Sequence, residues 1–222
     1  MPATGVIDWS FYWGAYWTAF YGFTFGWGFR ATGRENVPTT GPALLVANHQ
    51  SFIDPALIGL AATRPLTYLA RSNLWNNRIL ARLIDQLGAV PIDRGFGRDG
   101  LQTVFAELDK GKAVLMFPEG ERTRTGQLLP LKPGVSLVVK RVACPIVPIG
   151  VAGAYQAWPK HQTWPTLDPL PLASKGRAIG VAFGEPIDPT RYKGVEREAM
   201  LADLEVEIRK TIDAAERVRR TG

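Results

Sequence analysis

From residue 40 onward, short apolar runs alternate with longer stretches whose apolar residues recur every three or four positions. The amphipathic stretches predict helices at 55–62, 73–87, 100–110 and 134–142, and a final helix near 195–218. The segment 154–175 is rich in Pro and Trp and is predicted to be a long loop. The apolar runs predict strands at 43–47, 66–70, 89–92, 113–117, 146–150 and 178–183. This alternation is typical of a single α/β domain with a mostly parallel or mixed central sheet flanked by helices.

The N-terminal segment has a different pattern. Residues 9–29 carry no charge, and twelve of them are aromatic. Trp and Tyr prefer the headgroup boundary of a bilayer, and the glycines among them favour a bent or two-piece helix in the membrane plane. The alternative is an aromatic helix packed on the protein's own core. We predict an interfacial membrane anchor at 1–30 and one folded domain at 31–222.

Composition narrows the class of protein. A chain of 222 residues with 46% hydrophobic content can bury one core, which excludes a disordered chain. One cysteine, Cys144, excludes a disulfide framework, and with two histidines no closed zinc site is expected. Cys144 is expected to be a buried structural thiol, and His161 to lie at the surface. The protein is expected in a reducing compartment.

Charge is concentrated in the middle of the chain. Residues 64–141 carry thirteen basic and seven acidic groups, which accounts for the whole formal charge of +6. Such a field attracts phosphates, anionic lipid heads or nucleic acid without distinguishing them, and a solvated basic face is the plain alternative.

The turn after the first predicted strand of the domain carries candidate chemistry. His49 and Asp54 stand five positions apart across it. An imidazole can take a proton from an attacking hydroxyl, while a carboxylate on its other nitrogen fixes the tautomer. Asp54 before Pro55 is equally an ordinary helix N-cap, and Ser51 fits a helix start.

A glycine pattern suggests a different chemistry. Residues 95–100 match G-x-G-x-x-G after a predicted strand, as in a dinucleotide site. Asp93 and Arg94 intervene before the first glycine, and Asp99 would place a negative charge beside the pyrophosphate. A flexible glycine loop is the simpler interpretation.

Four blocks in order resemble one family. They are His49 and Asp54 in an N-H-x-x-x-x-D pattern, Gly88 to Arg94, Phe117 to Arg122 in an F-P-E-G-x-R pattern, and Val147 to Gly150. The sequence resembles the glycerolipid acyltransferases of the 1-acyl-sn-glycerol-3-phosphate acyltransferase type. The third block departs from the family pattern, because Glu121 stands where a small hydroxyl residue is usual.

The resemblance implies transfer of a fatty acyl group from acyl-CoA or acyl-carrier protein to the free hydroxyl of a lysophospholipid, most often lysophosphatidate. His49 would be the general base and Asp54 its orienting carboxylate, with no covalent acyl-enzyme. Arg94 and Arg122 would hold the acceptor phosphate, and Glu119 and Gly120 would complete that wall. No cofactor, metal or nucleic acid is expected, and the enzyme would work at the cytoplasmic face of the inner or plasma membrane.

Other functions stay open at this point. Within the family, the acceptor could be a lyso-aminolipid, which Glu121 favours, or lysophosphatidylglycerol or glycerol-3-phosphate. Outside it stand a dinucleotide-dependent oxidoreductase and a non-catalytic lipid-binding module. Either arginine could be a surface ion-pair partner, and residues 118–120 an ordinary turn.

Overall fold

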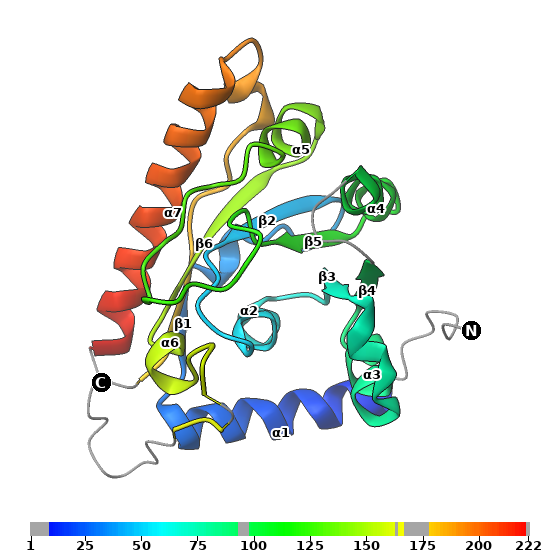
Figure 1. The fold of residues 1–222 in the computed structure, drawn as a ribbon, viewed down its shortest axis with the longest axis vertical. Helices are drawn as coiled ribbons and strands as arrows, with labels where there is room; N and C mark the ends of the chain where they lie inside the picture. The colour runs from blue at the N-terminus through cyan, green and yellow to red at the C-terminus, as the bar shows by residue number, and fades with distance from the viewer. Residues whose placement is uncertain (1–8, 93–97, 163, 167–177, 221–222) are drawn as a thin grey trace.

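The computed structural model describes residues 9–92, 98–162, 164–166 and 178–220. Its centre is a seven-stranded sheet in the order β1-β7-β6-β2-β5-β3-β4 (Figure 1). The strands are β1 (Arg30–Thr32), β2 (Ala43–Ala47), β3 (Leu66–Arg71), β4 (Ala89–Ile92), β5 (Ala113–Met116), β6 (Ile146–Ala152) and β7 (Gly180–Phe183). β6, β2, β5, β3 and β4 run parallel, and β7 pairs antiparallel with β6. The predicted α/β class and mixed central sheet are confirmed.

The helices fall close to their predicted positions. They are α1 (Trp9–Trp27), α2 (Asp54–Ala61), α3 (Arg78–Gln86), α4 (Arg98–Asp109), α5 (Val135–Arg141), α6 (Ala154–Ala157) and α7 (Arg197–Arg220), with 3-10 turns at Arg34–Asn36, Ser72–Asn76 and Pro189–Tyr192. Residues 73–76, predicted as the start of an α-helix, belong instead to the 3-10 turn at Ser72–Asn76. The predicted long loop at 154–175 begins with the short α6, which was not predicted.

The sheet separates two hydrophobic clusters. In β2, Leu45 and Ala47 join a cluster with α2 on one face, while Leu44 and Val46 join a second cluster with α4, α5 and α7 on the other. All five residues of β2 are buried, so the strand is a continuous apolar run, as expected of a parallel strand covered on both faces.

Glycines set how closely α7 approaches the sheet. A Cβ built on Gly150 of β6 would lie 2.1 Å from the backbone of Thr211, and one on Gly180 of β7 would lie 2.2 Å from the carbonyl oxygen of Ala215. No larger residue fits at either position without moving α7. The helix therefore lies directly against β6 and β7, as Figure 1 shows.

The N-terminal aromatic segment forms one continuous helix, α1, not two pieces. Tyr16, Phe20 and Phe23 pack against the core, and the Tyr16 hydroxyl donates to the carbonyl of Leu60 at 3.0 Å. The opposite face carries an exposed aromatic stripe, whose members are Trp13, Trp17, Tyr21 and Phe25, each 48–59% exposed. One face of the helix thus packs on the protein's own core, as in the alternative interpretation, and the interfacial anchor stays a prediction.

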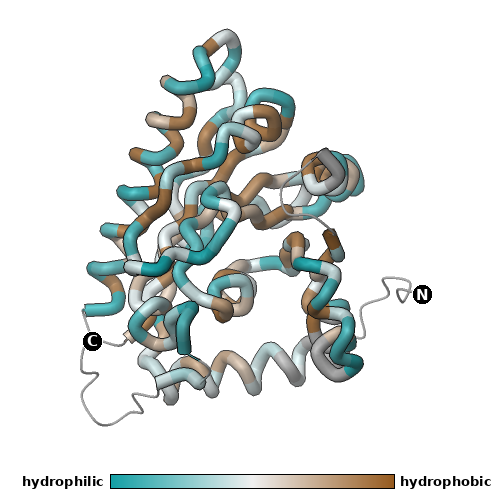
Figure 2. Tube along the Cα trace, viewed as in Figure 1, coloured by the Kyte–Doolittle hydropathy of each residue, from teal (hydrophilic) through white to brown (hydrophobic). Residues whose placement is uncertain are grey.

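Hydropathy distinguishes α1 from the core strands. In Figure 2, α1 is drawn mainly in pale tones, whereas β2 and β6 are brown. Among the described residues, no helix combines the length and apolar character needed to cross a membrane. The division into an anchor at 1–30 and a domain at 31–222 stays a prediction.

Candidate active site

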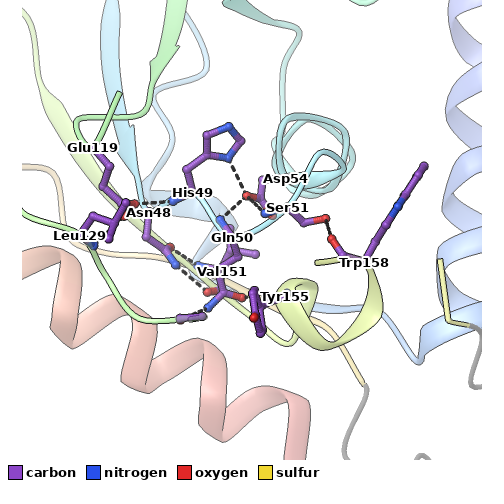
Figure 3. A network of polar contacts seen from close by, with 11 residues as sticks. Asn48, His49, Gln50, Ser51, Asp54, Glu119, Leu129, Val151, Tyr155 and Trp158 are labelled. Atoms are coloured by element: carbon purple, nitrogen blue, oxygen red, sulfur yellow. Dashed lines mark hydrogen bonds and ion pairs between the residues drawn. The ribbon is translucent and has the colours of Figure 1, made fainter. Parts of the chain in front are cut away.

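The carboxyl end of β2 leads into the turn that holds the predicted dyad. We call residues 48–54 the catalytic turn. His49 Nδ1 lies 2.8 Å from Asp54 Oδ2, with the imidazole side chain 18% exposed and the carboxylate fully buried (Figure 3). Because Asp54 engages Nδ1, the other ring nitrogen, Nε2, is the one left to act on a substrate.

Asp54 also organises the backbone of its own turn. Its Oδ2 accepts hydrogen bonds from the backbone amides of Gln50 at 2.6 Å and Ser51 at 2.7 Å. Oδ1 is buried and has no hydrogen-bond partner among the described residues. The prediction of Asp54 as the N-cap is wrong, because Ile53 is the N-cap of α2 and Asp54 is already its first helical residue. The Asp54 carboxylate binds amides that precede the helix, so it organises the turn and does not cap α2.

Two amide side chains, which the sequence did not single out, tie the turn to neighbouring elements. Asn48 exchanges two hydrogen bonds with the backbone of Val151 in β6, at 2.9 and 2.7 Å. Gln50 donates to the carbonyl of Gly126 at 3.0 Å and accepts from the amide of Tyr155 at 3.3 Å. The sequence does offer one sign of their role, because both are polar residues within three positions of the end of a fully buried strand.

Glu119 holds the backbone of His49. Its Oε1 accepts from the His49 amide at 2.6 Å and its Oε2 accepts from the Leu129 amide at 2.7 Å. The side chain is buried at 1% exposure, and this burial raises the pKa of its carboxyl to about 7, although the two backbone hydrogen bonds oppose the shift. Since both oxygens are engaged, the geometry gives Glu119 a positioning role, and its predicted contact with substrate stays untested.

The loop after β5 contacts the dyad from the other side. The Phe117 ring stacks on the His49 ring at a centroid distance of 4.0 Å, and the Thr123 amide donates to the His49 carbonyl at 2.9 Å. Gly120 has φ of +71°, and the side chain of Lys132 passes 3.4 Å from the place where a Cβ would lie. Gly120 is therefore required by the turn itself, and Lys132 lies beside it.

Of the two predicted phosphate ligands, Arg94 and Arg122, the structure describes only Arg122. Arg94 lies outside the described residues, as does part of the glycine pattern, at 95–97. The Arg122 guanidinium lies over the exposed Phe52 ring at 5.9 Å, and Phe52 makes an edge contact with Trp158. Arg122 thus reaches the catalytic turn, one residue away from Ser51.

Other polar and titratable groups have structural explanations. The Ser51 hydroxyl donates to the carbonyl of Trp158 at 2.7 Å, so it joins the catalytic turn to the segment after α6 and makes no capping hydrogen bond to α2. Cys144 is buried ahead of β6, at the sheet edge opposite the catalytic turn, and burial raises the pKa of its thiol. His161 is exposed, as predicted. No group of three or more His, Cys, Asp or Glu side chains gathers anywhere in the described part of the chain, so we assign no metal ligands.

An apolar cavity of about 260 Å³ lies between α1 and α2. Pro55 and Ala56, which line it, directly follow Asp54 in the sequence, whereas neither residue of the dyad lines the cavity. Its wall is apolar or aromatic throughout, and is completed by Tyr16, Ala19, Phe23, Gly59, Leu60, Leu66, Tyr68 and Leu87. A cavity with an apolar wall suits a hydrocarbon chain.

Comparison with known proteins settles the family. The family model described as "Acyltransferase" matches residues 28–152, which is more than half of the chain and includes the catalytic turn and the loop after β5. The chain belongs to the acyltransferase family. The resemblance predicted from the four blocks is therefore confirmed.

Relatives within this family carry a common name. The chain is 27% identical over 179 residues to the 1-acyl-sn-glycerol-3-phosphate acyltransferase of Bacillus subtilis, covering 80% of this chain and 82% of that protein. It is 30% identical over 131 residues to a chloroplastic 1-acyl-sn-glycerol-3-phosphate acyltransferase of Brassica napus, covering 57% of this chain and 38% of that protein. The chain thus matches less than two fifths of the length of such plastid relatives.

A solved structure shares the fold. The crystal structure of the 1-acyl-sn-glycerophosphate (LPA) acyltransferase PlsC from Thermotoga maritima superposes with a TM-score of 0.72 at 22% identity. The match covers 91% of this chain and 79% of that one. The two proteins therefore share the α/β architecture over about nine tenths of this chain and four fifths of the other.

Proposed function

We propose that this acyltransferase moves a fatty acyl group from an acyl thioester to the free hydroxyl of 1-acyl-sn-glycerol-3-phosphate, giving phosphatidate. The observation that carries the proposal is the 2.8 Å contact between His49 and the buried Asp54, inside a chain that belongs to the acyltransferase family. The names of its relatives in Bacillus subtilis and Brassica napus support the choice of acceptor.

The dyad supplies general-base catalysis. His49 Nε2 takes the proton of the acceptor hydroxyl while Asp54 stabilises the imidazolium that forms. The acceptor oxygen attacks the thioester carbonyl carbon, and the tetrahedral intermediate collapses as the carbon–sulfur bond breaks. The departing thiolate then receives the proton from His49. No enzyme nucleophile is needed, which agrees with the engaged hydroxyl of Ser51 and the remote, buried Cys144.

The two substrates would approach from different sides of the dyad. Arg122, at the catalytic turn, is suited to the acceptor phosphate because a guanidinium matches the geometry of phosphate oxygens, and Arg94 is proposed to join it. The apolar cavity beside Pro55 is suited to part of the donor's acyl chain. The donor carrier is proposed to be CoA or acyl-carrier protein.

Membrane association belongs to the same proposal. The four rings of the aromatic stripe are exposed on one face of α1, where they can enter a bilayer interface while the other face holds the helix to the core. Burying an aromatic side chain is worth about 1.5 to 3 kcal/mol, and salt does not screen it. We place the protein at the cytoplasmic face of the inner or plasma membrane.

A panel of acceptors tests the reaction. Purified enzyme is given one acyl-CoA and, in separate assays, lysophosphatidate, lysophosphatidylglycerol, a lyso-aminolipid and glycerol-3-phosphate, while thiol release is followed. The proposal expects lysophosphatidate to give the highest kcat/KM. A higher kcat/KM for any of the other three acceptors would make that lipid the proposed acceptor. If none of the four acceptors causes thiol release, the proposed reaction is refuted.

Substitution of the stripe tests the membrane role. Changing Trp13, Trp17, Tyr21 and Phe25 together to Ser should move the protein from the vesicle pellet to the supernatant in high salt. Leu137 and Val206 are also large, exposed and apolar but lie on α5 and α7, so a Leu137→Ser, Val206→Ser variant is the matched control and should stay in the pellet. Point substitutions are preferred to deleting residues 1–30, because the deletion would remove the buried Trp27 and Phe29. A stripe variant that still sediments in high salt would contradict this role.

A further inference from the structure

Three cations, Arg124, Lys132 and Lys160, act on the Glu121 carboxylate, and Arg122 is its neighbour in the sequence and lies over Phe52 of the catalytic turn. We call Arg122, Arg124, Lys132 and Lys160 the cationic rim. Glu121 forms an ion pair with Lys160, whose Nζ lies 3.2 Å from Glu121 Oε2. The hydrogen bond and charge of Lys160, followed by the charges of Lys132 and Arg124, lower the pKa of the Glu121 carboxyl, so this residue is ionised at neutral pH.

The rim is built from two loops that the catalytic turn holds in place. Thr123 of the first loop binds the His49 carbonyl, and the Lys132 amide donates to the Pro118 carbonyl at 2.8 Å. The second loop is held by the hydrogen bond from Ser51 to Trp158, two residues before Lys160. The Glu121 to Lys160 pair therefore bridges two loops that both contact the catalytic turn.

The charges of this group do not balance. Within the described part of the chain, Arg122, Arg124 and Lys132 form no ion pair, and Glu121 is the carboxylate that Lys160 binds. Four cations against one carboxylate leave an excess of three positive charges beside the catalytic turn, where the proposed function places the acceptor phosphate. The pair itself is exposed, with side-chain exposures of 48% for Glu121 and 32% for Lys160, so it can open at little cost.

We propose that Glu121 is a specificity-determining residue: in the substrate-free enzyme its carboxylate occupies the cationic site that the acceptor phosphate takes, and Lys160 passes from Glu121 to the phosphate on binding. The inference rests on the proposed function. Glu121 acts as an internal competitor, which weakens binding of any anionic headgroup. Lys160 becomes a further ligand of the acceptor phosphate, contributed by the loop that follows α6.

Steady-state kinetics of the full chain test the proposal. At low salt, Glu121→Gln should lower the KM for lysophosphatidate about two- to fivefold, in the range of an exposed ion pair, with kcat and the KM for acyl-CoA unchanged. Lys160→Ala should raise the same KM. In the Lys160→Ala background, Glu121→Gln should have a smaller effect, because no lysine is left to release. At about 1 M salt, where the Debye length is about 3 Å, the effect of Glu121→Gln should disappear.

A matched control separates this effect from a general change in charge. Glu205 on α7 forms an exposed pair with Arg209 at 2.7 Å, and Glu205→Gln should leave every constant unchanged. A Glu121→Gln variant whose KM for lysophosphatidate stays the same or rises overturns the proposal. So does a fall in the KM for acyl-CoA alone, which would assign the rim to the donor, or a selective loss of activity on an amine-bearing lysolipid, which would make Glu121 a ligand for cations.

Failure of the proposed function would be seen separately, as absence of lysophosphatidate turnover by the unsubstituted enzyme. The inhibition constant of glycerol 3-phosphate against the accepted substrate then reports on the rim directly. Stronger inhibition of Glu121→Gln, and weaker inhibition of Lys160→Ala, would support the competing carboxylate. Equal inhibition of all variants would overturn it.

Discussion

The catalytic turn and the cationic rim lie at the same edge of the sheet but are held in opposite ways. In the turn, Asn48, Ser51 and Asp54 are at most 2% exposed, and their hydrogen bonds run to backbone groups of the turn itself, β6 and the segment after α6. In the rim, side chains about a third to a half exposed meet in one ion pair at 3.2 Å. One region is fixed by buried bonds, and the other is assembled from charges that water and salt can reach.

This difference matches two separate tasks. Proton transfer needs a base held within hydrogen-bond reach of its substrate, so its geometry must not change when the ionic conditions do. Recognition of a headgroup needs an attraction that can form and release. We therefore expect the turn to control kcat and the rim to control the KM for the acceptor, and four experiments test this division.

The largest effect is expected at His49. His49→Ala should lower kcat by about 10² to 10⁴, the usual contribution of a positioned general base, while vesicle binding and thermal unfolding change little. Asp54→Asn should also lose rate, and it should lose stability as well because Oδ2 organises the turn. A His49→Ala enzyme that keeps more than about a tenth of the original turnover would remove the dyad from the mechanism.

The next effect concerns Glu119 and pH. Its pKa is raised from 4.5 to about 7, so between these values the folded protein holds a proton that the unfolded chain has released. The stabilising contribution is therefore complete below about pH 4.5 and lost by about pH 7, and a shift of this size corresponds to about 3 kcal/mol of unfolding free energy.

Denaturant unfolding at several pH values measures this contribution. The unsubstituted protein should lose stability as the pH rises from 5 to 7, and Glu119→Gln should show a flatter profile over the same interval. Parallel profiles for the two proteins would show that the carboxyl of Glu119 titrates normally, and the turn would then be less tightly buried than its hydrogen bonds indicate.

A smaller effect is expected at Arg122. Arg122→Ala should raise the KM for lysophosphatidate about tenfold, since hydrogen bonds to charged groups are worth about 1.5 to 3 kcal/mol, and should leave kcat nearly unchanged. Arg141 provides the control. Its guanidinium also lies over an aromatic ring, that of Phe105 at 4.6 Å, but Arg141 belongs to α5 and not to the loop beside the catalytic turn. Arg141→Ala should change neither constant. A large fall in kcat for Arg122→Ala would instead join this arginine to the catalytic turn.

The smallest effect is that of salt on the unsubstituted enzyme. Raising salt from about 0.05 to 0.5 M should increase the KM for lysophosphatidate a few-fold through screening of the rim. The kcat on a dispersed short-chain acceptor should stay constant, because the Asp54 carboxylate that orients His49 is fully buried. A matched change in both constants would contradict the division between the two regions.

The strands and longer helices could be predicted from the sequence more completely than the contacts of the site. β2 has its predicted bounds because a fully buried apolar run leaves few alternatives, and β4 also has its predicted bounds although its middle residues are only partly buried or exposed. β1 was missed because three residues, Arg30 to Thr32, show no apolar run, and their pairing with β7 depends on residues 150 positions away. The short α6 was missed because four residues show no helical period.

Within the site, local spacing was informative and distant contacts were not. His49 and Asp54 were predicted as a pair because five positions across one turn bring them together. The role of Glu119 depends on an amide 70 positions away, and the partner of Glu121 lies 39 positions away. Such contacts follow from the packing of loops after separate strands, which hydrophobic periodicity does not encode.

The pairing of β1 with β7 has a consequence for how the protein is made. β1 follows α1 directly and completes the sheet edge only when residues 180–182 are available, and α7 then closes over β6 and β7. Contacts so far apart in sequence form late during synthesis. The sheet edge that follows the aromatic helix therefore stays unpaired for most of translation, while the exposed aromatic stripe of the helix is available to lipid from the start. A nascent chain of this enzyme should consequently reach the lipid surface before it is folded, and ribosomes carrying a chain truncated ahead of residue 146 should already sediment with vesicles.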